Sequence, residues 1–142
     1  MYCYTLNELP KIAAELLARA VLHPVICFDA PMGAGKTTLV AAVCALLGVP
    51  AHEVSSPTYS LANEYVGGGG QRIFHLDCYR IAHPNEAIDA GIEDYLHTQK
   101  ALCFVEWYQV VAPLLPQSYW LATIKVLSAT ERSISFELIT NK

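Results

Sequence analysis

The sequence predicts an α/β fold in which a mixed β-sheet is flanked by helices and closed by a C-terminal antiparallel hairpin. A short apolar run at 25–28 leads through a glycine-rich turn into an apolar helical stretch. Another apolar run of strand length lies at 101–105, and longer runs at 120–127 and 133–139 flank a polar turn. Strands that alternate with helical segments are typical of α/β proteins. A chain of 142 residues can bury one sizeable core, so we expect residues 1–142 to form a single domain.

The turn after the first of these strands has the composition of a phosphate-binding loop. It reads Ala30-Pro31-Met32-Gly33-Ala34-Gly35-Lys36-Thr37-Thr38, close to the pattern G-x-x-x-x-G-K-[ST] of P-loop nucleotide-binding proteins. Its glycines let backbone N–H groups face phosphate oxygens, and a helix that begins at Lys36 points its positive dipole end the same way. Lys36 can reach the β- and γ-phosphates, and the Thr37 hydroxyl can ligate Mg²⁺. We expect the nucleotide to be bound by Met32, Gly33, Ala34, Gly35, Lys36, Thr37 and Thr38.

The loop departs from this pattern at its first position, where Ala30 stands in place of glycine. A Cβ there disfavours a positive φ and would crowd a closely bound phosphate, and the following Pro31 donates no N–H. We therefore expect a working site of reduced nucleotide affinity. The alternative is a glycine-rich strand–helix turn that carries an exposed lysine and binds no phosphate.

Composition narrows the classes of function. Hydrophobic residues make up 54% and charged residues 15%, as in a globular protein. The net charge of −4 argues against a free-standing nucleic-acid binder, which is usually basic, so contact with RNA would run through a basic partner. No apolar run has the length of a membrane span, and no basic region precedes an apolar one at the N-terminus. We expect neither a membrane anchor nor a signal peptide.

The cysteines indicate a reducing compartment. There are five of them, and no two have C-x-x-C spacing. Cys27 and Cys103 lie in apolar strand-like runs, and Cys44 lies in the apolar helix. We expect buried free thiols in a cytoplasmic protein rather than disulfides or a zinc site.

The N-terminal segment predicts a short strand at 1–5 and then a helix. Thr5 and Glu8 have the spacing of a capping box, and Pro10 falls in the first turn, where it is tolerated best. The helix is expected to extend to about Ala20. Its apolar face consists of Leu9, Ile12, Ala13, Leu16 and Leu17.

The segment 54–60 is rich in hydroxyl groups and interrupted by Pro57, so it predicts a loop. It lies one helix after the phosphate-binding loop, where a return loop can approach the γ-phosphate and switch with it. A plain Ser/Pro turn fits the spacing equally well. Two strands are expected next, at 61–66 and 72–76, with the four glycines 67–70 as a flexible hairpin tip.

Polar residues alternate with apolar ones at the end of the second of these strands. His75, Asp77 and Tyr79 would share one strand face, which is costly inside a core and natural beside a charged ligand. The alternatives are an Asp77–Arg80 pair and a half-buried histidine with satisfied hydrogen bonds. We do not expect His75 and Asp77 to bind a metal.

The apolar run 101–105 ends in Glu106 and Trp107. A carboxylate at this end of a strand lies at the sheet edge where ligands bind, where it could hold Mg²⁺ or orient an attacking water. The alternative is a surface glutamate at a strand end. Trp107 would either cover the site or fill the core, and the core is the commoner place for a lone tryptophan.

Shorter elements complete the C-terminal half. Short helical segments are expected from His83 and at 92–97, interrupted at Gly91, and a loop is expected between Pro113 and Pro116. The last two strands are joined through a turn at 128–132. Arg132 would stand at the hairpin tip, either solvated or in contact with a base or phosphate.

Together these residues resemble the TsaE (YjeE) family of bacterial phosphate-loop ATPases. The similarity runs from the first helix to Trp107, with a weaker echo in the final hairpin. A series of motifs in a fixed order along the chain is more specific for this family than the phosphate-binding loop alone. It consists of Gly33-Ala34-Gly35-Lys36-Thr37-Thr38, Ser56-Pro57-Thr58-Tyr59, Glu64-Tyr65, His75-x-Asp77-x-Tyr79-Arg80, Gly91-Ile92 and Val105-Glu106-Trp107.

The resemblance implies a mixed sheet flanked by helices, and binding and slow hydrolysis of ATP with Mg²⁺. It implies a role in forming threonylcarbamoyladenosine next to the anticodon of tRNA. Family members dock on a pair of proteins, TsaD and TsaB, so contact with tRNA is expected only through that complex and no membrane is involved.

The resemblance also implies roles by position. Lys36 would hold phosphate, Thr37 and Glu106 would ligate Mg²⁺, and Asp77 would act near the γ-phosphate as a catalytic or water-positioning carboxylate. Thr58 would belong to a switch-like loop and Trp107 would lie beside the site. Weaker contributions to the nucleotide pocket are implied near Tyr4 and Thr5 and from Arg132. The family usually has Gly-Asp where this chain has Ala30-Pro31.

Three other functions fit a phosphate-binding loop. A small-molecule kinase usually carries an arginine-rich lid, whereas Arg72, Arg80 and Arg132 are scattered here. A GTP-dependent switch would carry the guanine-reading motif Asn-Lys-x-Asp, which this sequence lacks. A nucleotide-binding adaptor without turnover differs from the ATPase only in hydrolysis.

Overall fold

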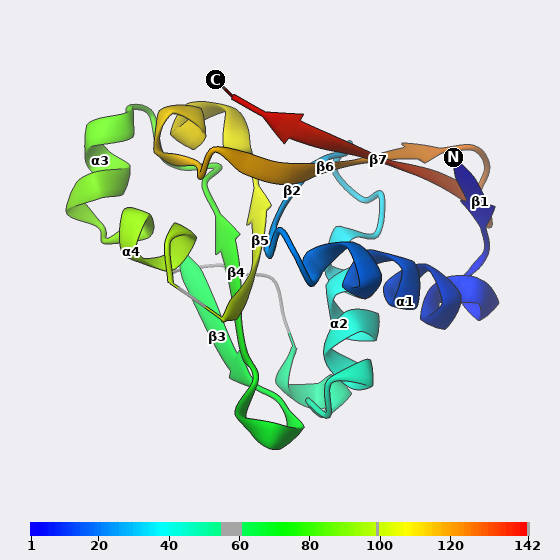
Figure 1. The fold of residues 1–142 in the computed structure, drawn as a ribbon. Coiled ribbons are helices and arrows are strands. Elements are labelled where there is room, and N and C mark those ends of the chain that lie inside the picture. Colours follow the sequence, from blue (N-terminus) through cyan, green and yellow to red (C-terminus); the bar gives the residue numbers. More distant parts are fainter. Residues whose placement is uncertain (55–60, 99, 142) are drawn as a thin grey trace.

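The computed structural model describes residues 1–54, 61–98 and 100–141, and its centre is a seven-stranded β-sheet in the order β1-β7-β6-β2-β5-β4-β3 (Figure 1). The strands are β1 (Tyr2–Tyr4), β2 (Val25–Asp29), β3 (Ala62–Val66), β4 (Arg72–Asp77), β5 (Ala101–Glu106), β6 (Ser118–Val126) and β7 (Arg132–Thr140). The α-helices are α1 (Leu9–Ala20), α2 (Lys36–Leu46), α3 (Pro84–Asp89) and α4 (Ile92–Leu96). The 3₁₀ turns are η1 (Leu6–Glu8), η2 (Ala51–Glu53), η3 (Gly68–Gly70) and η4 (Tyr108–Leu114).

The middle of the sheet is parallel and its outer strands are antiparallel. Strands β4, β5, β2 and β6 run in the same direction, while β3, β7 and β1 each pair antiparallel to a neighbour. In this register Phe28 lies opposite Glu106, and Glu106 lies opposite Asp77. The carboxyl ends of three adjacent strands therefore meet at one edge of the sheet. The predicted mixed α/β sheet with a C-terminal antiparallel hairpin is confirmed.

Helices cover both faces of the sheet (Figure 1). Helices α1 and α2 pack on one face, in a core that includes the stacked rings of Phe28 and Phe104, whose centroids lie 5.8 Å apart. Residues of α3, α4 and η4 pack on the other face against Cys27 and Cys103. Because successive strand residues point to opposite faces, each central strand is buried on both sides.

The N-terminal segment follows the prediction closely. Thr5 and Glu8 form the capping box, Pro10 lies in the first turn of α1, and the helix ends at Ala20. Four of the five predicted apolar residues are buried, and Leu17 is partly buried against the same core.

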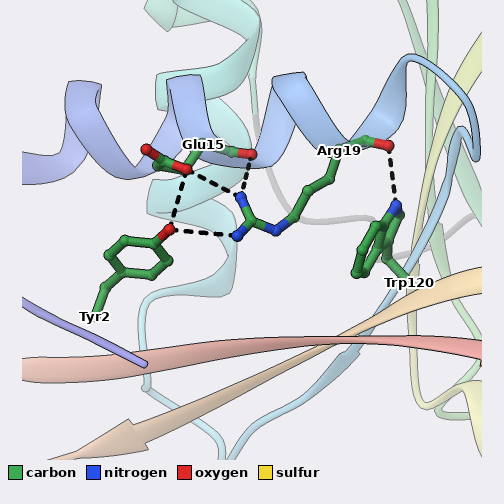
Figure 2. Close-up of polar contacts among 4 residues, drawn as sticks. All are labelled: Tyr2, Glu15, Arg19 and Trp120. Carbon is green, nitrogen blue, oxygen red and sulfur yellow. Dashed lines mark hydrogen bonds and ion pairs between the residues drawn. The ribbon is translucent and has the colours of Figure 1, made fainter.

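A cluster around Arg19 ties α1 to the sheet, as Figure 2 shows. The Arg19 guanidinium donates to the main-chain oxygen of Glu15 at 2.9 Å, to its carboxylate at 3.0 Å and to the Tyr2 hydroxyl at 3.3 Å. It also lies 4.4 Å from the ring centroid of Phe136. The Trp120 indole N–H donates to the main-chain oxygen of Arg19 at 2.9 Å. Residues of β1, β6 and β7 are thus held against one turn of α1.

The glycine-rich hairpin tip is exposed at 68–70 and is anchored at its first two glycines to the end of α2. The Gly68 N–H donates to the Leu47 main-chain oxygen at 2.7 Å, just beyond the end of α2. A Cβ on Gly67 would lie 2.3 Å from that same oxygen. Glycine is needed here because two backbones approach closely.

Other expectations were met in part. The 3₁₀ turn η4 includes Pro113 and ends at Leu114, so the predicted loop between Pro113 and Pro116 begins only at Leu115. The cysteines of the described chain are free, four of them buried and Cys3 exposed. Within the described ranges no helix is long and apolar enough to cross a membrane. The predicted switch-like loop with Thr58 lies outside the described residues.

Candidate functional site

The turn between β2 and α2 has the local geometry of a phosphate-binding loop. Gly33 and Gly35 have φ angles of 79° and 96°, in the left-handed region that favours glycine. The Ala34 N–H donates to the Pro31 oxygen at 3.1 Å, which closes a turn around Gly33. Lys36 then opens α2, as predicted. The N–H groups of the first helical turn therefore lie next to the loop, where they suit an anion.

Ala30 does not strain this loop, so the steric argument made from the sequence is wrong in its first part. Among the described non-glycine residues only Lys100 and Trp107 have a positive φ. The Ala30 side chain instead packs against the core beneath α1 and α2. The missing glycine therefore leaves the backbone of the loop intact.

Two cavities lie on either side of the loop and share Gly33, Gly35 and Thr38. The hairpin-side cavity has a volume of about 480 Å³. It is completed by Tyr4, Thr5, Leu6, Asn7, Leu9, Ala34, Ala129, Thr130 and Arg132. The strand-end cavity has a volume of about 460 Å³. It is completed by Met32, Lys36, Thr37, Asp77, Tyr79, Glu106 and Trp107.

Arg132 connects the final hairpin to the phosphate-binding loop. It is the first residue of β7, and its Nε donates to the Ala34 oxygen at 3.2 Å. Its Nη1 donates to the oxygens of Ser128 at 2.7 Å and Glu131 at 2.9 Å. The expectation of a solvated arginine at the tip is therefore wrong, because the side chain folds back over the turn and onto the loop.

Two ionisable side chains of the strand-end cavity, Lys36 and Glu106, form a group with His75, which lies buried outside the cavity. Lys36 Nζ lies 3.2 Å from Glu106 Oε1, and His75 Nε2 lies 2.5 Å from Glu106 Oε2. Glu106 is 6% exposed and His75 is completely buried. The alternative of a surface glutamate at the strand end is thus excluded, and so is the alternative of a half-buried histidine.

This environment keeps Glu106 ionised. Burial raises the pKa of its carboxyl, but the His75 hydrogen bond and the attraction of His75 and Lys36 outweigh that effect and lower the pKa. An ionised carboxylate only accepts hydrogen bonds, so His75 must donate through Nε2. Its Nδ1 is buried without a hydrogen-bond partner among the described residues.

Asp77 and two aromatic residues form the open side of the same cavity. The Asp77 Oδ1 accepts from the Tyr79 N–H at 3.0 Å. The rings of Tyr79 and Trp107 lie 5.1 Å apart, and Lys36 Nζ lies 5.4 Å from the Trp107 ring centroid. Trp107 is 38% exposed with a φ of 57°. The alternative that Trp107 fills the core is therefore excluded, and it lies beside the site in a strained backbone conformation.

The structure brings together most residues predicted for the site, in two groups around one loop. Only Thr58 lies outside the described residues. The sequence analysis did not predict the bond from His75 to Glu106, nor Asn7 and Thr130 as cavity residues. The alternation of His75 with Asp77 was the available signal, since it places both on the face that carries Glu106.

The described residues contain no group of three or more His, Cys, Asp or Glu side chains that could hold a metal by themselves. Mg²⁺ is usually bound in proteins through one or two carboxylates together with substrate phosphates. Glu106 and the Thr37 hydroxyl offer hard oxygen ligands in the strand-end cavity. Lys36 and the helix N-terminus offer positive charge for phosphate.

Comparisons with known proteins agree with this geometry. The model of the family described as "Threonylcarbamoyl adenosine biosynthesis protein TsaE" matches residues 3–134. The Haemophilus influenzae tRNA threonylcarbamoyladenosine biosynthesis protein TsaE is 37% identical over 125 residues, which cover 85% of this chain and 76% of that protein. The Treponema pallidum protein of the same name is 30% identical over 111 residues, covering 78% and 79%.

The fold of this chain is also similar to that of a solved structure. The crystal structure of Bacillus subtilis YdiB superposes with a TM-score of 0.69 at 26% identity, over 99% of this chain and 84% of that chain. The family match covers nearly all of the sequence that forms the sheet, the loop and both cavities. The chain therefore belongs to the TsaE family of threonylcarbamoyl adenosine biosynthesis proteins.

Proposed function

We propose that this chain binds Mg-ATP on its phosphate-binding loop and hydrolyses it slowly to ADP and phosphate. This activity would support homologues of TsaD and TsaB in forming threonylcarbamoyladenosine next to the anticodon of tRNA. The observation that carries the proposal is the loop itself, which separates two cavities and places Lys36 and Glu106 together in one of them.

The two cavities suggest where each part of the nucleotide binds. The hairpin-side cavity, at about 480 Å³, is within the range of about 300–1,000 Å³ common for small-molecule sites. Tyr4, Leu6 and Leu9 give it an apolar wall suited to a nucleobase and ribose. The triphosphate would then cross the loop at Gly33 and Gly35 and end in the strand-end cavity. This arrangement accounts for the glycines at the point shared by both cavities.

The strand-end cavity provides the groups that hydrolysis requires. Lys36 would exchange its contact with Glu106 for a phosphate oxygen, and Glu106 and Thr37 would hold Mg²⁺. Bound Mg²⁺ would neutralise charge on the phosphates and help to position them. Asp77 would orient the attacking water, and Trp107 and Tyr79 would limit the access of solvent from the open side.

The role in tRNA modification is supported by family membership and by the names of the relatives. The net charge of −4 gives this chain little attraction for RNA, so we propose that it meets tRNA only through the TsaD–TsaB complex.

The test is phosphate release from Mg-ATP by the purified chain, alone and with TsaD and TsaB homologues from the same organism. We expect slow release alone, faster release with the partners, and loss of release in Lys36→Ala. Lys11→Ala is the matched control, because Lys11 is an exposed lysine on α1 outside both cavities. No release in any mixture, despite ATP binding, would contradict hydrolysis and favour a nucleotide-binding adaptor.

The destination of the γ-phosphate distinguishes the proposed ATPase from a small-molecule kinase, the remaining alternative. A kinase would pass the γ-phosphate to a small acceptor molecule, whereas we expect one inorganic phosphate for each ADP formed. Incubation with γ-labelled ATP and an extract of small metabolites would separate the two. Label recovered in an organic product would overturn the ATPase proposal.

A further inference from the structure

A completely buried histidine lies directly behind Glu106. His75 Nε2 holds one carboxylate oxygen, Oε2, at 2.5 Å, and Lys36 Nζ holds the other, Oε1, at 3.2 Å. His75 is 0% exposed and does not line either cavity. The Glu106 carboxylate is therefore held by His75 on the core side and by Lys36 on the cavity side.

The register of the sheet explains how the two side chains meet. His75 on β4 lies opposite Phe104, and Asp77 lies opposite Glu106 on β5. Residues two apart on a strand share a face, so His75 and Glu106 are diagonal neighbours on the side covered by α2. A glutamate at a strand end has several rotamers open to it, and this contact selects one of them.

The cost of burying His75 shows that packing alone does not explain it. Its Nδ1 has no hydrogen-bond partner in the part of the chain that the structure describes. An aliphatic residue would fill the same space without leaving a polar atom unsatisfied. Among the described residues, the polar contact of the His75 ring is the one with Glu106. Burying the imidazole therefore costs free energy, and the hydrogen bond to Glu106 is the interaction that can offset this cost.

We infer that His75 is a positioning residue whose Nε2–H fixes the rotamer of Glu106, so that Oε1 faces the phosphate side of the strand-end cavity. This inference rests on the proposed function, because it is Mg-ATP hydrolysis that needs the carboxylate there. Residues behind a metal ligand commonly act in this way, by orienting the ligand without touching substrate.

Two variants separate positioning from packing. His75→Leu removes the donor and the unsatisfied nitrogen, and His75→Gln keeps an N–H donor of similar reach. We expect kcat for phosphate release to fall about 10–100-fold in His75→Leu. KM for ATP should change less than about twofold, and His75→Gln should recover most of the rate.

His97→Leu is the matched control. The Nε2 of His97 lies 2.8 Å from the Leu114 main-chain oxygen, away from both cavities, so this variant also loses one histidine hydrogen bond. Its kcat should match that of the wild type. A His75→Leu enzyme with unchanged kcat, or an equal loss in His75→Leu, His75→Gln and His97→Leu, would overturn the inference.

A measurement on the nucleotide-free protein tests the contact without relying on ATPase activity. ¹⁵N NMR of the imidazole rings should show His75 protonated at Nε2, with its ring signals shifted in Glu106→Gln. If the wild type releases no phosphate in any mixture, the proposed function fails and this spectrum alone decides the contact. An Nε2 without a proton, or signals that ignore Glu106→Gln, would overturn the inference.

Discussion

Two regions of the molecule combine a glutamate, a cation and aromatic rings. They differ in how completely the polar atoms of their side chains find hydrogen-bond partners. In the Arg19 cluster the cation bonds to Glu15 and Tyr2 (Figure 2) and also lies over the ring of Phe136. In the strand-end cavity Lys36 and Glu106 are paired beside Trp107. There the buried His75 leaves Nδ1 without a partner in the described chain, and Trp107 adopts a positive φ.

The difference separates structural from functional polar groups. The Arg19 cluster joins α1 to three strands through bonds that satisfy its own atoms, as expected of a group that stabilises the fold. At the strand-end cavity the backbone of Trp107 is strained, and the Nδ1 of the neighbouring His75 has no partner among the described residues. Proteins retain both features mainly where function requires them. Substitutions in the first region should therefore change stability, and substitutions in the second should change catalysis.

The largest effect is expected from Asp77→Ala. Asp77 lines the cavity beside Glu106, and its Oδ1 accepts only a local main-chain N–H among the contacts described. We expect phosphate release to fall by about 10²-fold or more, because one group that stabilises the transition state is lost. ATP affinity and Tm should stay close to wild type, measured by calorimetric titration and thermal unfolding. Unchanged turnover would contradict the role proposed for Asp77.

The reverse pattern is expected from Arg19→Ala. The variant loses stacking on Phe136 and the bonds to Glu15 and Tyr2, for a cost of about 1–3 kcal/mol. In a chain of this size that lowers Tm by roughly 2–12 °C. The kcat of the folded enzyme should not change. A variant that kept its Tm but lost turnover would break the division between the two regions.

The loss of stability at acid pH should distinguish Glu106 from Glu15. The pKa of Glu106 is lowered, so its contribution to stability is present above the ordinary value of 4.5 and is lost as pH falls through the lower folded-state pKa. The hydrogen bonds from Arg19 and Tyr2 also lower the pKa of Glu15, but that carboxylate is exposed and well screened. Tm measured from pH 7 to strongly acidic pH should fall less steeply in Glu106→Gln than in the wild type. Glu15→Gln should follow the wild-type curve closely, and the opposite order would show that the exposed pair is the stronger one.

The smallest effect is expected from Ala30→Gly, which restores the family's usual residue. Ala30 has no positive φ and packs against the core, so glycine should not tighten ATP binding. The added backbone freedom of the unfolded chain should cost up to about 1 kcal/mol of stability. Denaturant unfolding and the KM for ATP measure the two effects. A several-fold lower KM would restore the idea that the alanine crowds the phosphate.

The sequence alone was enough to predict the elements around the loop, because their signals are local. Glycine spacing, the capping box of Thr5 and Glu8, and apolar runs of strand length depend only on neighbouring residues. The place of Glu106 at the sheet edge beside the loop also followed from the rule that ligand sites lie where parallel strands end. These features determined the fold class and most of the candidate site.

Tertiary structure decided what neighbouring residues cannot encode. His75 meets Glu106 only because β4 and β5 are adjacent in a particular register, and Trp107 leaves the core because the chain turns sharply after β5. Arg132 reaches the phosphate-binding loop through a hairpin that returns 98 residues later in the chain. Periodicity shows which face a side chain occupies, whereas its partner across the sheet is set by strand order, which is a property of the whole packed chain.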